Sequence, residues 1–131
     1  MSSGLNIFLN KKILIYGLGK SGLATFNFLK KKSEIFLYDD NQKNFKNLIS
    51  YKILKKTKFD FIIISPGIDI NKCQLSNFLK KNSKKIYTDL DIFFSFFNND
   101  CITVTGTNGK STTCQLLYEI LLKQNYHVKL V

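Results

Sequence analysis

The residues with the clearest chemistry lie late in the chain, where positions 104–113 read VTGTNGKSTT. Gly106 and Gly109 let backbone N–H groups turn toward the oxygens of a phosphate, and the start of a following helix adds its positive dipole end. Lys110 is spaced to reach the β- and γ-phosphates of a nucleotide, and the Ser111 hydroxyl is spaced to bind Mg²⁺. The run therefore predicts a phosphate-binding loop.

The spacing of this loop departs from the general pattern G-x-x-x-x-G-K-[ST], because only Thr107 and Asn108 separate its glycines. A polar loop that contains Gly-Lys-Ser by chance is the alternative. The flanking sequence favours the phosphate loop, since residues 101–104 form an apolar run typical of a strand. Apolar residues then recur at helical spacing, at Cys114, Leu117, Tyr118 and Leu121. A strand before the loop and a helix after it must therefore position it.

A second glycine turn, GLGKSG over residues 17–22, lies between a predicted strand at 12–16 and a predicted helix at 21–32. The next predicted strand, 34–38, ends at Asp39 and Asp40. This order is typical of a Rossmann βαβ unit, in which the glycine turn holds a pyrophosphate and the acid holds a ribose or base. The alternative is that the glycines only permit close packing and that the aspartates cap a helix over residues 42–49.

The remaining elements alternate in the same way. Strands are predicted over residues 51–54, 59–64 and 84–88, and helices over 73–81 and 90–97. The alternation predicts a parallel α/β sheet of five or so strands. The turn Ser65-Pro66-Gly67, where proline ends the strand and glycine allows a positive φ, is either a ligand-binding edge or a simple chain reversal. The phenylalanine-rich helix at 90–97 is expected to pack on both sides, with an exposed partner-binding patch as the alternative.

The 131 residues have room for about one ordinary domain, yet the phosphate loop lies close to the C-terminus. Residues 126–131 read as the beginning of another strand. We therefore expect a Rossmann-like domain over residues 1–98. Residues 99–131 are expected to be the opening strand, P-loop and helix of a truncated ATPase domain, with little support for its C-terminal part.

The formal net charge is +11, and all 20 basic residues are lysines scattered in ones to threes. A chain without arginine lacks the bidentate fork used to read bases, so we expect solvated helix faces and no nucleic-acid partner. Biased codon usage is a further explanation for the lysines. Cys73, Cys101 and Cys114 lack metal spacing, which predicts reduced thiols, the last two as small core residues. With no signal peptide and no apolar membrane span, we expect a soluble cytoplasmic protein.

Three motifs, GLGKSG, ISPGI and VTGTNGKSTT, occur in this order and at these separations, and they resemble the N-terminal portion of the Mur ligase family. The resemblance runs from Lys12 onward and is strongest to the D-glutamate-adding member. It implies a monomeric, three-domain enzyme of peptidoglycan synthesis that binds a UDP substrate, Mg²⁺ with ATP, and an amino acid. ATP would phosphorylate the carboxylate of UDP-N-acetylmuramoyl-L-alanine, and the D-glutamate amine would attack the acyl phosphate to form an amide.

The resemblance also implies the site residues. Those at the UDP substrate are Gly17, Gly19, Lys20, Ser21, Asp39, Asp40, Ser65, Pro66 and Gly67. Those at ATP are Gly106, Thr107, Asn108, Gly109, Lys110, Ser111 and Thr112, with Lys110 and Ser111 catalytic and Ser111 on the metal. Asp40 departs from the family, where a hydroxyl residue is frequent. Other catalytic groups lie beyond Val131 in relatives, so the 131 residues alone are expected not to catalyse ligation.

Two other functions stay open at this stage. A NAD-dependent oxidoreductase could be built on the first βαβ unit, although it leaves TGTNGKST unexplained. A non-catalytic UDP-sugar-binding module would use the first domain alone. Binding of NADH or of UDP distinguishes these possibilities.

Overall fold

The computed structural model describes residues 6–43, 45–97 and 100–130, and the chain divides into two compact units, Met1–Asn98 and Asn99–Val131. This division is a property of the backbone contacts. The assignment of the units as a UDP-substrate domain and the start of an ATP-binding domain stays a prediction.

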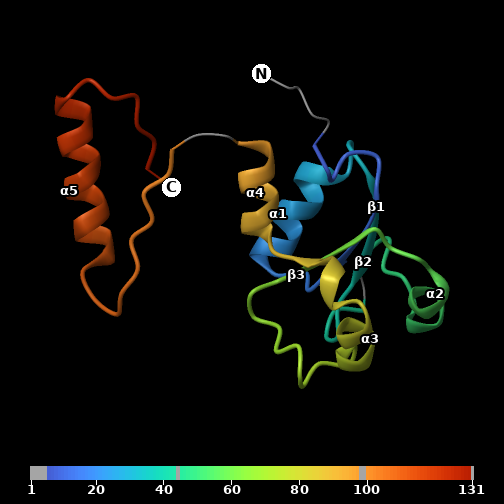
Figure 1. The fold of residues 1–131 in the computed structure, drawn as a ribbon. Helices are drawn as coiled ribbons and strands as arrows, with labels where there is room; N and C mark the ends of the chain where they lie inside the picture. The colour runs from blue at the N-terminus through green and yellow to red at the C-terminus, as the bar shows by residue number, and fades with distance from the viewer. Residues whose placement is uncertain (1–5, 44, 98–99, 131) are drawn as a thin grey trace. The chain divides into compact units, whose positions relative to one another are not determined.

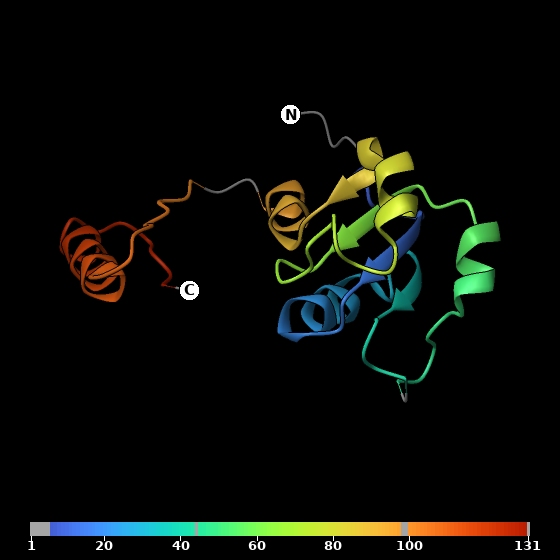
Figure 2. The same ribbon diagram turned by 90° about the horizontal axis from the view of Figure 1, so that it is seen from below.

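Unit 1 is built on a parallel sheet of β1 (Lys12–Tyr16), β2 (Glu34–Tyr38), β3 (Phe61–Ile64) and β4 (Ile86–Tyr87) in the order β2-β1-β3-β4 (Figure 1). Figure 2 shows the strand arrows running in a common direction. Successive residues of β1 point to opposite faces, so both faces of the strand are apolar and buried, as a parallel sheet requires. The predicted parallel α/β domain is confirmed.

Helices cover both faces of this sheet. They are α1 (Lys20–Leu29), α2 (Tyr51–Lys56), α3 (Ser76–Lys81) and α4 (Asp89–Phe96), with a short 3₁₀ turn, η1 (Ser83–Lys85). Leu29 of α1 and Ile92 of α4 belong to one core cluster with Ile13 and Ile15. Leu54 of α2 and Leu79 of α3 belong to the other. The two clusters make unit 1 a three-layer α/β/α structure.

Two predicted elements between β2 and β3 are wrong. Residues 51–54, predicted as a strand, begin α2, because the Ser50 hydroxyl accepts a hydrogen bond from the Ile53 N–H and caps the helix. The sheet described here therefore has four strands rather than five. In the described part of 42–49 there is no helix either, since Leu48 bridges Leu37 and the Ile49 N–H donates to the Leu37 carbonyl.

The expectation that the phenylalanine-rich helix packs on both sides is also wrong. Thr88 and Asp91 form a capping box that begins α4, and Ile92 turns into the core. Phe93 and Phe94 are 43% and 52% exposed. Only one face of the helix meets α1 and the sheet, so its other face stays at the surface.

Unit 2 contains α5 (Lys110–Lys123) between segments without regular secondary structure. The strands predicted at 101–104 and from 126 are absent over the described residues, because a strand needs a neighbour to accept its ladder hydrogen bonds. Cys101 is exposed and Cys114 only half-buried, so neither is a core residue. The predicted apolar face of α5 is nevertheless its least exposed face. No helix in the described ranges is both long and apolar enough to cross a bilayer.

Candidate functional site

The turn between β1 and α1 is shaped by two glycines. Gly17 has φ +95°, a left-handed conformation that a Cβ would strain, and that Cβ would lie 2.8 Å from Ile68 and 2.9 Å from Ser65. At Gly22 a Cβ would lie 1.9 Å from the Gly17 carbonyl oxygen, so only glycine lets α1 approach β1 this closely. Gly19 is different, because apart from its chain neighbours no described atom lies within 4 Å of the position of its Cβ. It is exposed at the helix start.

Hydrogen bonds join this turn to the ends of both neighbouring strands. The Gly17 N–H donates to the Tyr38 carbonyl at 2.9 Å, where β2 ends. The Ser65 N–H donates to the Tyr16 carbonyl at 3.0 Å, and the Ser65 hydroxyl donates to the Gly17 carbonyl at 2.9 Å, where β3 ends. The structure thus brings the residues predicted at the UDP substrate to one edge of the sheet.

The third segment at this edge is the turn after β3. The Ile68 N–H donates to the Ser65 carbonyl at 3.1 Å and closes the turn, leaving Pro66 and Gly67 exposed. Gly67 does not use the positive φ that glycine allows, because among the described glycines only Gly17, Gly106 and Gly109 have one. Proline and the closing hydrogen bond suffice to reverse the chain here.

Asp39 binds the backbone on both sides of it. Its Oδ2 accepts from the Leu18 N–H at 2.7 Å, and its Oδ1 accepts from the Asn41 and Gln42 N–H groups at 2.9 Å each. Burial acts to raise the pKa of the Asp39 carboxyl, but the N–H donors of Leu18, Gln42 and Asn41 together lower it below its ordinary value. The ionised Asp39 carboxylate therefore holds the glycine turn against the end of β2 by hydrogen bonds to the backbone.

Asp40 points into the interior instead. Its Oδ2 accepts from the buried Tyr16 hydroxyl at 2.6 Å and lies 3.4 Å from the Gln74 N–H, while its Oδ1 is enclosed without a described partner. Burial first, and then the hydrogen bond to Asp40, raise the pKa of Tyr16 well above its ordinary value. Burial and the charge of Asp40 also raise the pKa of Tyr38. The two adjacent aspartates thus have different environments, and only Asp39 holds the turn.

The start of α1 presents Lys20 and Ser21. No side chain caps the helix at Gly19, so the first N–H groups of α1 are available to an anion. Lys20 is exposed, whereas the Ser21 hydroxyl donates to Asp89, the first residue of α4. A serine hydroxyl has one proton, so Ser21 can serve a diphosphate oxygen only by leaving Asp89. Asp89 was missed from the sequence because it lies 68 positions away and belongs to no motif.

Unit 2 holds the other predicted site residues, on the loop before α5. Gly106 and Gly109 have φ +150° and +74°, so both glycines use conformations that other residues avoid. The Lys110 ammonium donates to the carbonyl oxygens of Gly106 and Thr107 and so folds over the loop. Asn108, Ser111 and Thr112 are exposed. The described part of unit 2 therefore contains a glycine turn and a helix that begins at Lys110, without a described strand before them. The assignment of this turn as a P-loop stays a prediction.

The residues of this loop fit a nucleotide phosphate better than they fit a metal ion. An ammonium held by carbonyl oxygens can exchange them for phosphate oxygens, and the first turn of α5 has no side-chain cap over its N–H groups. For Mg²⁺ the loop offers only the Ser111 hydroxyl. Nowhere in the described ranges do three or more His, Cys, Asp or Glu side chains gather as a metal site. Magnesium would therefore depend mainly on phosphate oxygens and water.

Comparisons with known proteins give one consistent result. The chain is 34% identical over 127 residues to a protein of Rickettsia prowazekii named UDP-N-acetylmuramoylalanine--D-glutamate ligase, covering 89% of this chain and 28% of the relative. The proteins of the same name from Aquifex aeolicus and Buchnera aphidicola are 35% and 32% identical, covering 86% and 91% of this chain and 26% and 30% of theirs. No protein-family model matches the chain. The chain therefore spans little more than a quarter of the length of these relatives.

Proposed function

We propose that this chain, a relative of the D-glutamate-adding Mur ligases over 89% of its length, forms the substrate-nucleotide site and the ATP loop of such a ligase in peptidoglycan synthesis. The observation that supports this proposal most strongly is the share of the chain that the match to the relative covers. Unit 1 makes up 98 of the 131 residues, about 75%, so a match of 89% must include part of unit 2. An oxidoreductase built on the first βαβ unit accounts for neither the loop nor this extent. The free thiols of all three cysteines are consistent with a cytoplasmic location.

In this proposal the two glycine turns bind different phosphates. The start of α1 and Lys20 would hold the diphosphate of UDP-N-acetylmuramoyl-L-alanine, with Asp39 fixing the turn and Ser65 holding the Gly17 carbonyl. Residues 106–110 would hold the ATP phosphates, and Ser111 would bind Mg²⁺. ATP supplies the phosphoryl group that makes a carboxylate reactive toward the amine of D-glutamate. The contribution of these residues is positioning and charge neutralisation.

The test is calorimetric titration of the chain with UDP-N-acetylmuramoyl-L-alanine, UDP and NADH. We expect both uridine nucleotides to bind and NADH not to bind. Lys20→Gln should weaken binding of the uridine nucleotides by about tenfold, because it removes one charge-assisted contact to the diphosphate. Lys43→Gln makes the same charge change outside the glycine turn and should bind as the parent does. Binding of NADH alone would move the assignment to an oxidoreductase, and equal weakening by both variants would remove Lys20 from the site.

Lys110 allows a separate test of the second loop. Lys110→Met should weaken binding of ATP with Mg²⁺ by about tenfold, because the ammonium that lies over the loop is lost. Lys123→Met, at the other end of α5, is the matched control and should leave binding unchanged. Calorimetry with ATP and Mg²⁺ measures both. If Lys110→Met binds ATP as tightly as the parent chain, the loop is not the phosphate site.

A further inference from the structure

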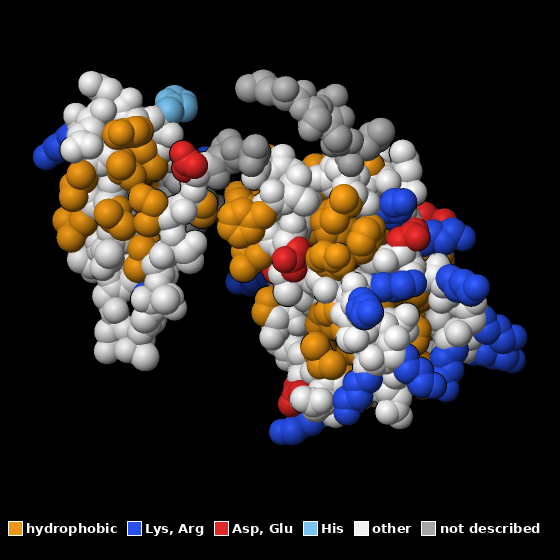
Figure 3. All heavy atoms as spheres, in the orientation of Figure 1, with side chains coloured by type: hydrophobic (Ala, Val, Ile, Leu, Met, Phe, Trp, Pro, Cys, Tyr) orange, Lys and Arg blue, Asp and Glu red, His pale blue; other side chains and the backbone are white. Residues whose placement is uncertain are grey.

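The lysines that are scattered along the sequence gather at one edge of unit 1. In a parallel sheet with helical crossovers, the amino ends of the strands and the carboxyl ends of the helices lie at the same edge. Twelve of the 20 lysines occupy these positions. We call them the basic edge: Lys11, Lys12, Lys30, Lys31, Lys32, Lys55, Lys56, Lys58, Lys80, Lys81, Lys84 and Lys85. Figure 3 shows lysine side chains crowded over the right and lower right of unit 1, the side on which α2 lies in Figure 1.

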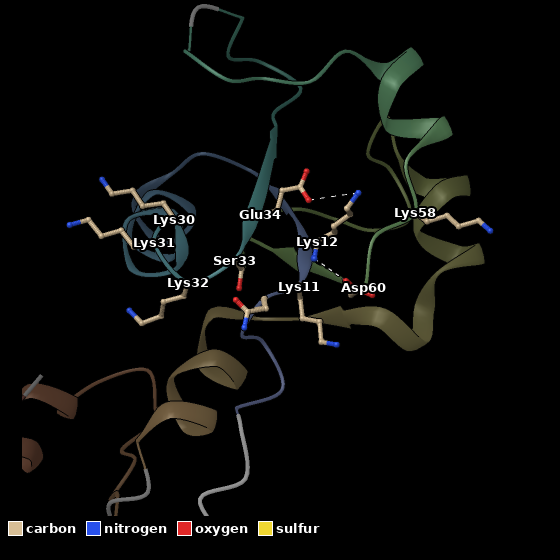
Figure 4. A pocket seen from close by; sticks show the side chains of 10 residues that line it. Lys11, Lys12, Lys30, Lys31, Lys32, Ser33, Glu34, Lys58 and Asp60 are labelled. Atoms are coloured by element: carbon tan, nitrogen blue, oxygen red, sulfur yellow. Dashed lines mark hydrogen bonds and ion pairs between the residues drawn. The ribbon is translucent and has the colours of Figure 1, made fainter.

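Carboxylates offset only a small part of this charge. Among the described residues only Glu34 and Asp60 lie at the amino ends of the strands, and both are engaged with Lys12. Glu34 pairs with the Lys12 ammonium at 3.7 Å, and Asp60 accepts from the Lys12 N–H at 2.9 Å, as Figure 4 shows. The aspartates of the glycine turn, Asp39 and Asp40, lie at the opposite edge. Biased codon usage explains many lysines, but it does not explain their separation from the acids.

The form of the basic edge indicates what kind of anion it suits. An open hollow of about 670 Å³ lies between the lysines that follow α1 and those at the start of β1 (Figure 4). Among the described residues the four helices of unit 1 present only their carbonyl ends at this edge, so none of them offers the N–H groups of a helix start to a single phosphate there. The chain also has no arginine for bidentate base readout. Dispersed lysines without fixed donors suit a broad anionic surface rather than one small anion.

The helix α2 adds apolar contacts to this charge. Tyr51 and Ile53 are 43% and 52% exposed, and Lys52, Lys55 and Lys56 flank them on the same short helix. The Lys55 ammonium lies over the Tyr51 ring, 4.4 Å from its centroid. Figures 1 and 2 both place α2 at the outer margin of unit 1. Tyr51 and Ile53 are two positions apart and point to different sides of α2, and of the two Ile53 lies nearer the carboxyl end of the helix, where an apolar side chain among lysines suits the interface of a bilayer.

We propose that the basic edge, with the exposed Ile53 of α2, docks unit 1 on the surface of a membrane rich in anionic phospholipid. The glycine-turn edge then faces away from the lipid, so the docked protein keeps its nucleotide site open. Docking of this kind is peripheral and electrostatic. It weakens steeply with salt, because the charges are exposed and screened by ions.

The test is sedimentation of the full chain with vesicles. Vesicles of phosphatidylglycerol and phosphatidylcholine should bind the chain at low salt, whereas vesicles of phosphatidylcholine alone should not. The variant carries Lys11→Gln, Lys31→Gln, Lys56→Gln and Lys58→Gln, four exposed lysines that have no partner among the described residues. Each replacement should weaken binding on the order of fivefold. Circular dichroism checks that the variant is folded.

The matched control carries Lys43→Gln, Lys46→Gln, Lys72→Gln and Lys129→Gln, which remove the same charge outside the basic edge. The control should bind anionic vesicles as the parent does. Three results would overturn the proposal. These are no binding of the parent chain to anionic vesicles, equal losses in variant and control, and tighter binding of duplex DNA or inorganic polyphosphate than of the vesicles.

Discussion

Gly22→Ala should strongly destabilise unit 1. The new methyl group would lie 1.9 Å from the Gly17 carbonyl oxygen and 3.0 Å from the Ser65 hydroxyl. The first contact is with backbone, so α1 must move away from β1 to relieve it. We expect the free energy of unfolding to fall by about 3 to 5 kcal/mol, a large part of the roughly 5 to 15 kcal/mol of an ordinary domain. Urea unfolding followed by circular dichroism measures the change.

Gly19→Ala is the matched control for this prediction. Apart from its chain neighbours, its Cβ would have no described atom within 4 Å, and its φ of −68° suits any residue. We expect a change within about 0.5 kcal/mol. If the two variants unfold alike, α1 does not approach β1 as closely as the structure shows, and the glycine turn is only a flexible connection.

Asp39→Ala should lower the free energy of unfolding by roughly 2 to 3 kcal/mol at neutral pH. Three backbone N–H groups lose their acceptor, and that of Leu18 is buried, since Leu18 is 1% exposed. Water can replace the carboxylate at Asn41 and Gln42, which are exposed, but it cannot reach Leu18. Asp100→Ala removes an exposed carboxylate with no described hydrogen-bond partner and should unfold as the parent chain does. Equal stability of Asp39→Ala and the parent would show that the Asp39 carboxylate does not hold the glycine turn.

The contribution of Asp39 should also depend on pH, with a definite sign. Because the pKa of Asp39 is lower in the folded chain than in the unfolded chain, its stabilisation is present at neutral pH. It is lost as the pH falls through the lowered pKa of the folded state. The difference in unfolding free energy between the parent and Asp39→Asn, measured from neutral pH downward, should therefore shrink in acid. A difference that grows in acid would mean that the neutral carboxyl is the form bound in the folded chain.

The first strands and the glycine turn could be predicted from the sequence because they depend on residues that are close together in the chain. The strands 12–16 and 34–38 and the glycine turn between them are as expected, since an apolar run followed by GLGKSG leaves few alternatives. The prediction of a strand at 51–54 was wrong because a short apolar run is compatible with both a strand and a helix. The Ser50 cap, visible in the sequence, decides for the helix.

The site could be predicted less completely. The carboxyl ends of β1, β2 and β3 bring together the three predicted segments, as the rule for open α/β sheets implies. The pairing of Ser21 with Asp89 could not be predicted, because it depends on where α4 lies against α1. In unit 2 the glycine turn and the start of α5 depend on near neighbours, and the phosphate-binding role of this turn stays a prediction. The two strands predicted on either side of this loop and helix do not form, because no described residue provides a neighbouring strand to pair with them.

The sequence by itself determined the order of elements, the two glycine turns and the apolar face of α5, because each depends on residues within a few positions of one another. The tertiary structure decided what those residues do. The Asp39 carboxylate accepts hydrogen bonds from the backbone and the Asp40 carboxylate accepts one from Tyr16, because the two adjacent side chains leave the end of β2 in different directions. The tertiary structure also brings together lysines from the four segments that lead into β1, β2, β3 and β4. They share one edge because parallel strands begin on the same side of a sheet, and the helices between them end on that side.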